Sequence, residues 1–237
     1  MHHSKHTYHH DEHELHGYLA YAEKDDKPKP TVLVVHDWSG QNEFAQQKAK
    51  MFAKLGYVGF AVDMYGLGKV AKKNEEKEAL MHPLIQDRLM LRTRIQAALD
   101  TVVTLPQVDK QNVAVLGYCF GGLCALDLAR SGAEIKGAIS VHGLLSKPED
   151  LPNQTIEAKV LVLQGAEDPM VSPTAVETFC DEMTAEKVDW QVHTFGQTKH
   201  AFTNPHAHDT DNGLIYSALA ARRSTLLIDS FLEEIFG

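Results

Sequence analysis

Short runs of β-branched and apolar residues alternate along this chain with segments that have helical periodicity. The clearest run is TVLVVH at 31–36, which follows a turn predicted at 23–30. Similar runs predict strands at 57–62, 112–117, 135–142, 158–164 and 188–195. The intervening segments predict helices at 44–55, 120–130, 173–185 and 213–235, and a charged helical stretch at 72–104 that is broken near Pro83. Strands that are apolar on both faces need cover on both, so the pattern predicts an α/β fold with a mostly parallel central sheet and helices on both faces.

Length and charge narrow the classes of protein that fit. The 237 residues contain no internal repeat and no linker, so we expect a single domain over 1–237. The formal net charge is −9 and no basic cluster is present, which argues against nucleic acid as a partner. No apolar run approaches the roughly 18 residues of a membrane span, and the N-terminus lacks a signal-peptide core. We therefore expect no membrane partner and a cytoplasmic location, while the sequence gives no indication of oligomeric state.

A cysteine stands where a strand turns sharply into a helix, in VAVLGYCFGGLCALDLA at 113–129. Gly117-Tyr118-Cys119-Phe120-Gly121 has the G-x-nucleophile-x-G pattern, with Cys in place of the commoner Ser. The flanking glycines allow a strained backbone at the nucleophile, and the following helix N-terminus favours a thiolate. Cys119 is thus the predicted nucleophile.

An elbow nucleophile requires an acid and then a histidine, each after a later strand. Asp168 follows the strand at 158–164, and His200 follows the strand at 188–195. Glu167 is the alternative acid. His206 and His208 are alternative bases, but they fall in a polar loop further along the chain.

These residues suggest a division of roles. Cys119 attacks a carbonyl carbon, His200 transfers the proton, and Asp168 orients the imidazole. The backbone N–H groups of Phe120 and Trp38 are the expected oxyanion donors. For His142, at the end of the strand at 135–142, we expect a structural role beneath the site.

The other cysteines and the N-terminal histidines receive simpler interpretations. Three cysteines without paired spacing argue for reduced thiols, and Cys124 and Cys180 fit helix positions in or near the core. Seven of the fourteen histidines lie in the first sixteen residues, which raises the alternative of a metal site. His9, Asp11 and His13 instead alternate like the polar residues of an exposed hairpin, so we expect no metal and no cofactor.

Five motifs in order resemble the dienelactone hydrolase family of α/β-hydrolases: LVVHDWSG, GYVGFAVDMYG, GYCFGG, GAEDPMV and KHAFTNP. The resemblance covers nearly the whole chain and implies the α/β-hydrolase fold, with the triad at Cys119, Asp168 and His200. It also implies that Asp37 contacts the resting thiol, at a place where dienelactone-processing members carry Glu.

The same resemblance weakens the case for dienelactone as the substrate. Those members pair the substrate carboxylate with an Arg four residues after the base, and Asn204 stands there in this chain. Arg88 or Arg92 is a candidate to supply the missing charge, and a solvated helix face is the alternative reading of both.

The leading hypothesis is a cofactor-independent hydrolase of small esters or lactones that works through an acyl-thiol intermediate at Cys119. One alternative keeps the chemistry and changes the substrate to a thioester or activated acyl group. Another is a non-catalytic protein on the same fold, with Cys119 as a redox-sensing thiol.

Overall fold

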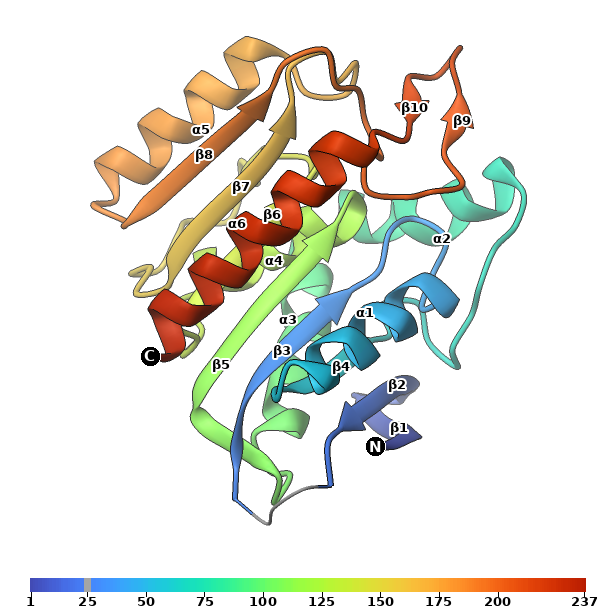
Figure 1. Ribbon diagram of the computed structural model, residues 1–237, viewed down its shortest axis with the longest axis vertical. Coiled ribbons are helices and arrows are strands. Elements are labelled where there is room, and N and C mark those ends of the chain that lie inside the picture. The colour runs from blue at the N-terminus through green and yellow to red at the C-terminus, as the bar shows by residue number, and fades with distance from the viewer. Residues whose placement is uncertain (24–26) are drawn as a thin grey trace.

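The structure is a computed structural model in which residues 1–23 and 27–237 are described. Its centre is an eight-stranded sheet with the strand order β1-β2-β4-β3-β5-β6-β7-β8 (Figure 1). The strands are β1 (His2–His10), β2 (His13–Tyr21), β3 (Lys29–Val35), β4 (Val58–Val62), β5 (Val108–Tyr118), β6 (Gly137–Val141), β7 (Lys159–Gly165) and β8 (Trp190–Phe195). From β4 to β8 every neighbouring pair is parallel, whereas β1–β2 and β2–β4 are antiparallel. The predicted mostly parallel sheet is confirmed, and the turn predicted at 23–30 includes residues 24–26, which lie outside the described residues.

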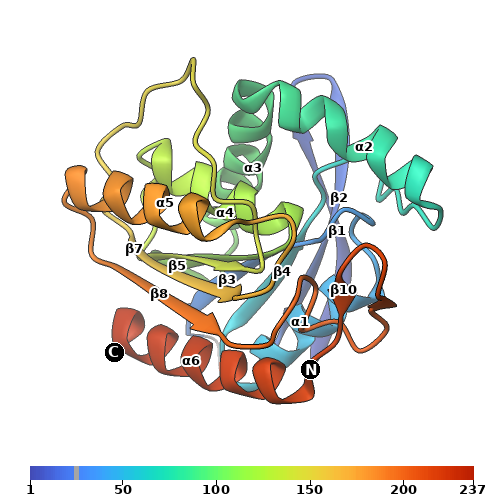
Figure 2. The same cartoon turned by 90° about the horizontal axis from the view of Figure 1, so that it is seen from above.

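Helices cover both faces of this sheet, as the alternating pattern predicts. Figure 2 shows α2, α3, α4 and α5 on one face and α1 and α6 on the other. The helices are α1 (Glu43–Lys54), α2 (Asn74–Gln86), α3 (Arg88–Val102), α4 (Phe120–Arg130), α5 (Pro173–Ala185) and α6 (Ala218–Phe236). Each layer encloses its own large apolar cluster against the sheet. Within the described part of the chain, no helix is both long and apolar enough to cross a membrane.

The histidine-rich N-terminus forms the predicted hairpin, but the hairpin belongs to the main sheet. Strands β1 and β2 pair along their whole length, and β2 adds to β4 at the sheet edge. His9, Asp11 and His13 are exposed, whereas Tyr8 and Leu15 are buried in the core. No group of three or more His, Cys, Asp or Glu among the described residues is placed to hold a metal ion.

One predicted helix break is shifted along the chain and one predicted helix start was wrong. The break expected near Pro83 falls at Asp87, and Pro83 itself lies inside α2. Asp87 leaves helical geometry and its carboxylate accepts the Met90 N–H, so a side-chain cap starts α3 there. The last helix begins at Ala218 and not near 213.

The reason for the later start of α6 lies in the preceding residues. Gly213 has φ +68°, which a right-handed helix does not accommodate, and the next residues form the short strand β10 (Leu214–Ile215). This strand pairs with β9 (His208–Asp209) in a small hairpin beside the carboxyl ends of the main strands (Figure 1). Ser217 then caps α6 by accepting the Ala220 N–H.

Candidate active site

Cys119 occupies the sharp turn between β5 and α4. Its backbone has φ +54° and ψ −116°, a conformation that costs energy for any residue with a side chain. The turn is crowded: a Cβ on Gly117 would lie 1.8 Å from the carbonyl oxygen of Gly121, and one on Gly121 would lie 2.4 Å from that of Val35. Only glycine fits at these two places. The elbow predicted from the sequence is therefore present in the structure.

Asp168 and His200 meet at the same edge of the sheet, after β7 and β8. His200 Nδ1 lies 2.8 Å from Asp168 Oδ2, and both side chains are almost fully buried. Gln164 donates its side-chain amide to the same carboxylate oxygen at 2.7 Å, and the Met170 N–H donates to the other at 2.8 Å. The carboxylate is therefore held in place independently of the histidine.

The charge of His200 depends on Cys119. Burial alone would lower the pKa of His200, but the negative charge of Cys119 in its ionised form, followed by the hydrogen bonds with Asp168 and with Cys119, outweighs it and raises the pKa to about 10. Nε2 of His200 is the nitrogen left on the Cys119 side, and it bonds to none of the other described residues. With Nδ1 bound to Asp168, this second nitrogen is the one left for proton transfer.

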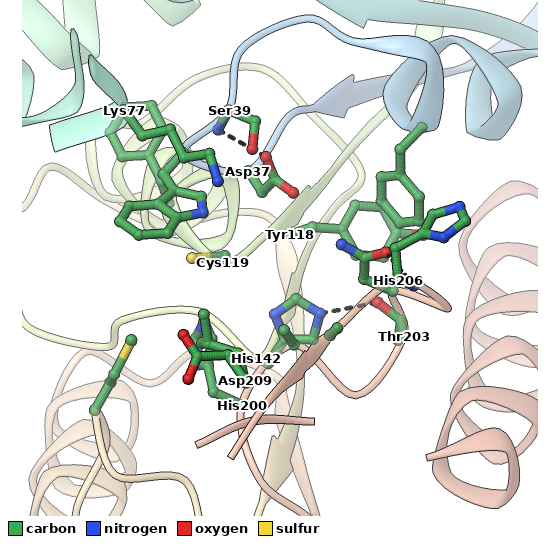
Figure 3. Close-up of a pocket in the computed structure, with 18 of the residues that line it drawn as sticks. Asp37, Ser39, Lys77, Tyr118, Cys119, His142, His200, Thr203, His206 and Asp209 are labelled. Atoms are coloured by element: carbon green, nitrogen blue, oxygen red, sulfur yellow. Dashed lines mark hydrogen bonds between the residues drawn. The ribbon is translucent and has the colours of Figure 1, made fainter. Parts of the chain in front are cut away.

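A cavity of about 600 Å³ lies over these side chains. Figure 3 shows Cys119, His142 and His200 around the same space, with Asp37 and Lys77 on the opposite side. Its lining is rich in large apolar side chains: Trp38, Phe44, Met81, Tyr118, Phe120, Leu144, Met170 and Leu214. The polar part of the lining includes three carboxylates, those of Asp37, Glu78 and Asp209. A concave cavity that combines apolar walls with polar groups is typical of a small-molecule site.

The loop after β3 contributes Asp37 and Trp38 to the cavity. Asp37 Oδ1 accepts the Ser39 N–H at 2.8 Å, which caps the turn (Figure 3). No hydrogen bond joins Asp37 to Cys119 in the described part of the structure. Neither the Trp38 nor the Phe120 backbone N–H donates to an acceptor among the described residues, so both remain available to a ligand.

The alternative acid and the two alternative bases differ from Asp168 and His200 in burial and position. Glu167 is exposed and does not line the cavity, whereas His206 and His208 line it from exposed positions. His142 is buried, with Nε2 2.8 Å from Thr203 Oγ1 and its ring centroid 5.1 Å from that of His200. Burial, and then the charge of His200, hold the pKa of His142 well below its usual value, so it is neutral.

Arg88 and Arg92 do not line the cavity, so the prediction that one of them supplies charge to a substrate carboxylate was wrong. The alternative prediction, a solvated helix face, was wrong as well. Arg88 makes two hydrogen bonds of 2.7 Å to the fully buried Asp127, and Arg92 lies 3.9 Å from the same carboxylate. Their side chains are only 9% and 8% exposed, so they form no solvated helix face. Asp127 is a buried anion on α4 that requires these cations.

Lys77 is the side chain that sequence reasoning missed. It is the one Lys or Arg among the described residues that line the cavity, and Nζ lies 4.8 Å from the centroid of the Trp38 ring. Nothing in the charged run around Lys77 distinguishes it from its neighbours, because only the packing of α2 over the loop after β3 decides which lysine faces the cavity.

Comparisons with known proteins place the fold in a known family. A family model described as the dienelactone hydrolase family matches residues 15–236. A Yersinia pestis protein named "Putative carboxymethylenebutenolidase" is 27% identical over 200 residues, covering 80% of this chain and 74% of its own. A Bradyrhizobium protein named "Probable 2-oxo-3-(5-oxofuran-2-ylidene)propanoate lactonase" is 26% identical over 208 residues, covering 84% and 82%. The crystal structure of a dienelactone hydrolase-like promiscuous phosphotriesterase, P91, from metagenomic libraries has a TM-score of 0.93 and 34% identity, covering 100% of this chain and 99% of that one.

Proposed function

The chain belongs to the dienelactone hydrolase family, which makes it an ester or lactone hydrolase, and from that premise we propose that it acts through a Cys119-His200-Asp168 triad and an acyl-thiol intermediate. The observation that carries the proposal is the convergence of the strained Cys119 elbow and the buried His200–Asp168 pair on one cavity. The family supplies the reaction class, and the geometry supplies the candidate roles.

The reaction begins when the Cys119 thiolate attacks the carbonyl carbon of the ester or lactone. The new S–C bond turns the carbonyl oxygen into an oxyanion, which the Trp38 and Phe120 N–H groups stabilise. When this oxyanion collapses, the C–O bond breaks and the leaving alkoxide takes the proton from Nε2 of His200. An acyl-thioester on Cys119 remains.

Hydrolysis of the thioester reverses the proton flow. Nε2 of His200 removes a proton from water, and the hydroxide attacks the acyl carbon. Collapse of the second oxyanion releases the carboxylic acid and returns the thiolate beside a protonated His200. Asp168 stays ionised throughout and keeps Nδ1 protonated.

The cavity suggests which substrates fit. Its volume of about 600 Å³ accommodates a small ester or lactone, and its apolar lining suits an aromatic or unsaturated ring. Lys77 offers a positive charge to a substrate carboxylate, in place of the arginine that is absent at Asn204. We therefore expect lactones that bear a carboxylate to be accepted despite Asn204.

The test compares Cys119→Ala with Cys180→Ala on a panel of p-nitrophenyl acetate, neutral lactones and carboxylate-bearing lactones. Cys180 lies on α5 and does not line the cavity, so its variant controls for loss of a thiol. We expect hydrolysis to be abolished only by Cys119→Ala, and a quenched wild-type reaction to show the acyl mass on the peptide containing Cys119. Full activity of Cys119→Ala would refute the mechanism, and no turnover of any ester by wild type would favour a redox-sensing thiol.

A second activity is worth assaying on the same panel. The phosphotriesterase likeness covers essentially the whole of both chains at 34% identity, which supports attack by the same nucleophile on a phosphotriester. Paraoxon hydrolysis by wild type, lost in Cys119→Ala, is the expected result.

Thioesters belong in the panel as well, because the acyl-thiol chemistry does not distinguish them from oxygen esters.

A further inference from the structure

His36 is a fully buried histidine that the triad chemistry does not use. It follows the last residue of β3 and precedes Asp37, and its ring packs against Tyr65 and Phe120, with centroids 4.7 and 6.1 Å away. Both ring nitrogens have backbone partners. Nδ1 lies 2.6 Å from the carbonyl oxygen of Asp37, and Nε2 lies 3.2 Å from the amide nitrogen of Met64.

These partners allow only one form of the imidazole. A carbonyl oxygen accepts, so Nδ1 must carry the proton, and an N–H donates, so Nε2 must be bare. Burial lowers the pKa of His36, and the Asp37 carbonyl and the neighbouring carboxylates oppose this only in part. His36 is therefore neutral, with its proton on Nδ1.

The carbonyl that His36 holds belongs to the peptide whose N–H is that of Trp38. In a trans peptide the C=O and N–H point in opposite directions, so an anchored carbonyl fixes the direction of the N–H. The Gly40 N–H donates to the same Asp37 carbonyl at 3.3 Å. The next carbonyl, that of Trp38, accepts the Tyr65 hydroxyl at 3.0 Å.

We propose that His36 is a positioning residue of the oxyanion hole, which aims the Trp38 N–H at the cavity by donating Nδ1–H to the Asp37 carbonyl. This proposal rests on the proposed function, because it assumes that an oxyanion forms beside Trp38. The hydrogen bond also polarises the peptide, so the Trp38 N–H becomes a stronger donor. His36 touches no substrate and acts only through this peptide.

Two substitutions of His36 test the hydrogen bonds of its two ring nitrogens separately. In His36→Asn the amide nitrogen takes the place of Nδ1 and retains the donor to the Asp37 carbonyl. In His36→Gln the amide oxygen takes the place of Nε2 and retains the acceptor for the Met64 N–H. The Asp37 carbonyl then loses the ring donor at 2.6 Å and keeps only the longer contact with the Gly40 N–H at 3.3 Å. Both variants remove one hydrogen bond from a buried site, so similar losses of melting temperature are expected.

Catalysis should distinguish them. Because removing an oxyanion donor costs about 10²–10³-fold in kcat, a misdirected donor in His36→Gln should cost about 10- to 100-fold, with KM nearly unchanged. His36→Asn should retain kcat within about threefold. A trifluoromethyl ketone, which forms a tetrahedral oxyanion with Cys119, should bind His36→Gln more weakly in proportion to the loss of kcat.

Several outcomes would overturn the proposal. Equal kcat values in the two variants, or unchanged trifluoromethyl ketone affinity in His36→Gln, would show that His36 is only structural. Wild-type ¹⁵N chemical shifts of His36 give a test that needs no variant, and a charged ring or a proton on Nε2 would contradict it. If Cys119→Ala abolishes hydrolysis while His36→Gln behaves like wild type, this inference fails and the proposed function stands.

Discussion

His200 shares one oxygen of Asp168 with Gln164: Nδ1 of the histidine lies 2.8 Å and the glutamine amide nitrogen 2.7 Å from Oδ2. The carboxylate thus receives two hydrogen bonds from outside the proposed triad, from Gln164 and from the Met170 N–H, and one from His200. Since Asp168 cannot turn freely, the His200 ring is fixed with Nε2 toward Cys119 and the cavity. The electrostatic interaction of His200 with Cys119 and Asp168 should therefore be measurable in the titration of His200.

The first prediction concerns that titration. In wild type the pKa of His200 is about 10, so the imidazolium persists through neutral pH and loses its proton only as the pH approaches 10. Cys119→Ala removes the negative charge that raises the pKa of His200 against the effect of burial. The pKa of His200 should therefore fall, and its proton should leave at lower pH. Histidine NMR titrations measure this, with Cys180→Ala as control and His200→Asn for assignment. Identical titrations in wild type and Cys119→Ala would contradict the coupling.

The second prediction is the order in which the thiols react. Cys119 lines the cavity beside His200, whereas Cys124 is fully buried in α4 and burial raises its pKa well above the usual value. Cys180 is partly exposed, but burial raises its pKa too. Substoichiometric iodoacetamide should label Cys119 first, then Cys180, and Cys124 only after unfolding. Peptide mapping that finds Cys180 labelled first would count against the site.

The third prediction separates the histidines around the cavity. His200→Asn should remove most esterase activity, because Nε2 is the proposed proton carrier. His206→Asn and His208→Asn should leave kcat within a few-fold, since both are exposed and neither bonds to Asp168. Steady-state kinetics on p-nitrophenyl acetate decide the matter. A loss at His206 as large as that at His200 would mean that the base is misassigned.

The sequence predicted the fold and the elbow because both depend on local patterns. Alternating apolar runs require a covered parallel sheet, and the glycines at 117 and 121 are the only residues that fit the crowded turn. The pairing of Asp168 with His200 was also predictable, since the carboxyl ends of neighbouring parallel strands meet at one edge.

The substrate-facing charges were not predictable in this way. Arg88 and Lys77 both lie in one charged helical stretch, and periodicity does not show that the first is bound to a buried carboxylate and the second faces the cavity. Only the tertiary packing of α2 and α3 against α4 and the loop after β3 decides that. His36 offered a partial signal, as a histidine at the end of a buried strand, but its two backbone partners come from chain segments far apart.

The fourth prediction concerns Asp37, whose contact with the resting thiol stays a proposal. Asp37→Asn retains a side-chain oxygen for the Ser39 N–H and removes a negative charge from the cavity that Cys119 also lines, while Asp37→Ala loses both. Because a nearby carboxylate disfavours a thiolate, Asp37→Asn should speed alkylation of Cys119 and inactivation by hydrogen peroxide. Its activity should fall less than that of Asp168→Asn. If Asp37→Asn reacts at the wild-type rate and only Asp37→Ala melts earlier, the carboxylate is merely a cap.

The fifth prediction tests charge selection at Lys77. Lys77→Met retains the apolar stem against Trp38 and removes the charge. A partly exposed ion pair is worth up to about 1 kcal/mol, so kcat/KM for a carboxylate-bearing lactone should fall about fivefold, while a neutral ester is unaffected. Lys72→Met is the matched control, because Lys72 is exposed and does not line the cavity.

Asn204→Arg should act in the opposite direction, since it introduces a cation at a residue that already lines the cavity. The change also removes the hydrogen bond that Asn204 Oδ1 accepts from the His206 N–H at 3.0 Å, so a lower kcat on both substrates is expected to accompany the gain in selectivity. The deciding quantity is the ratio of kcat/KM for the charged lactone to kcat/KM for the neutral ester. It is measured at low and at high salt, because screening by salt weakens an exposed ion pair. If this ratio is the same in wild type and Lys77→Met at low salt, Lys77 does not select the carboxylate.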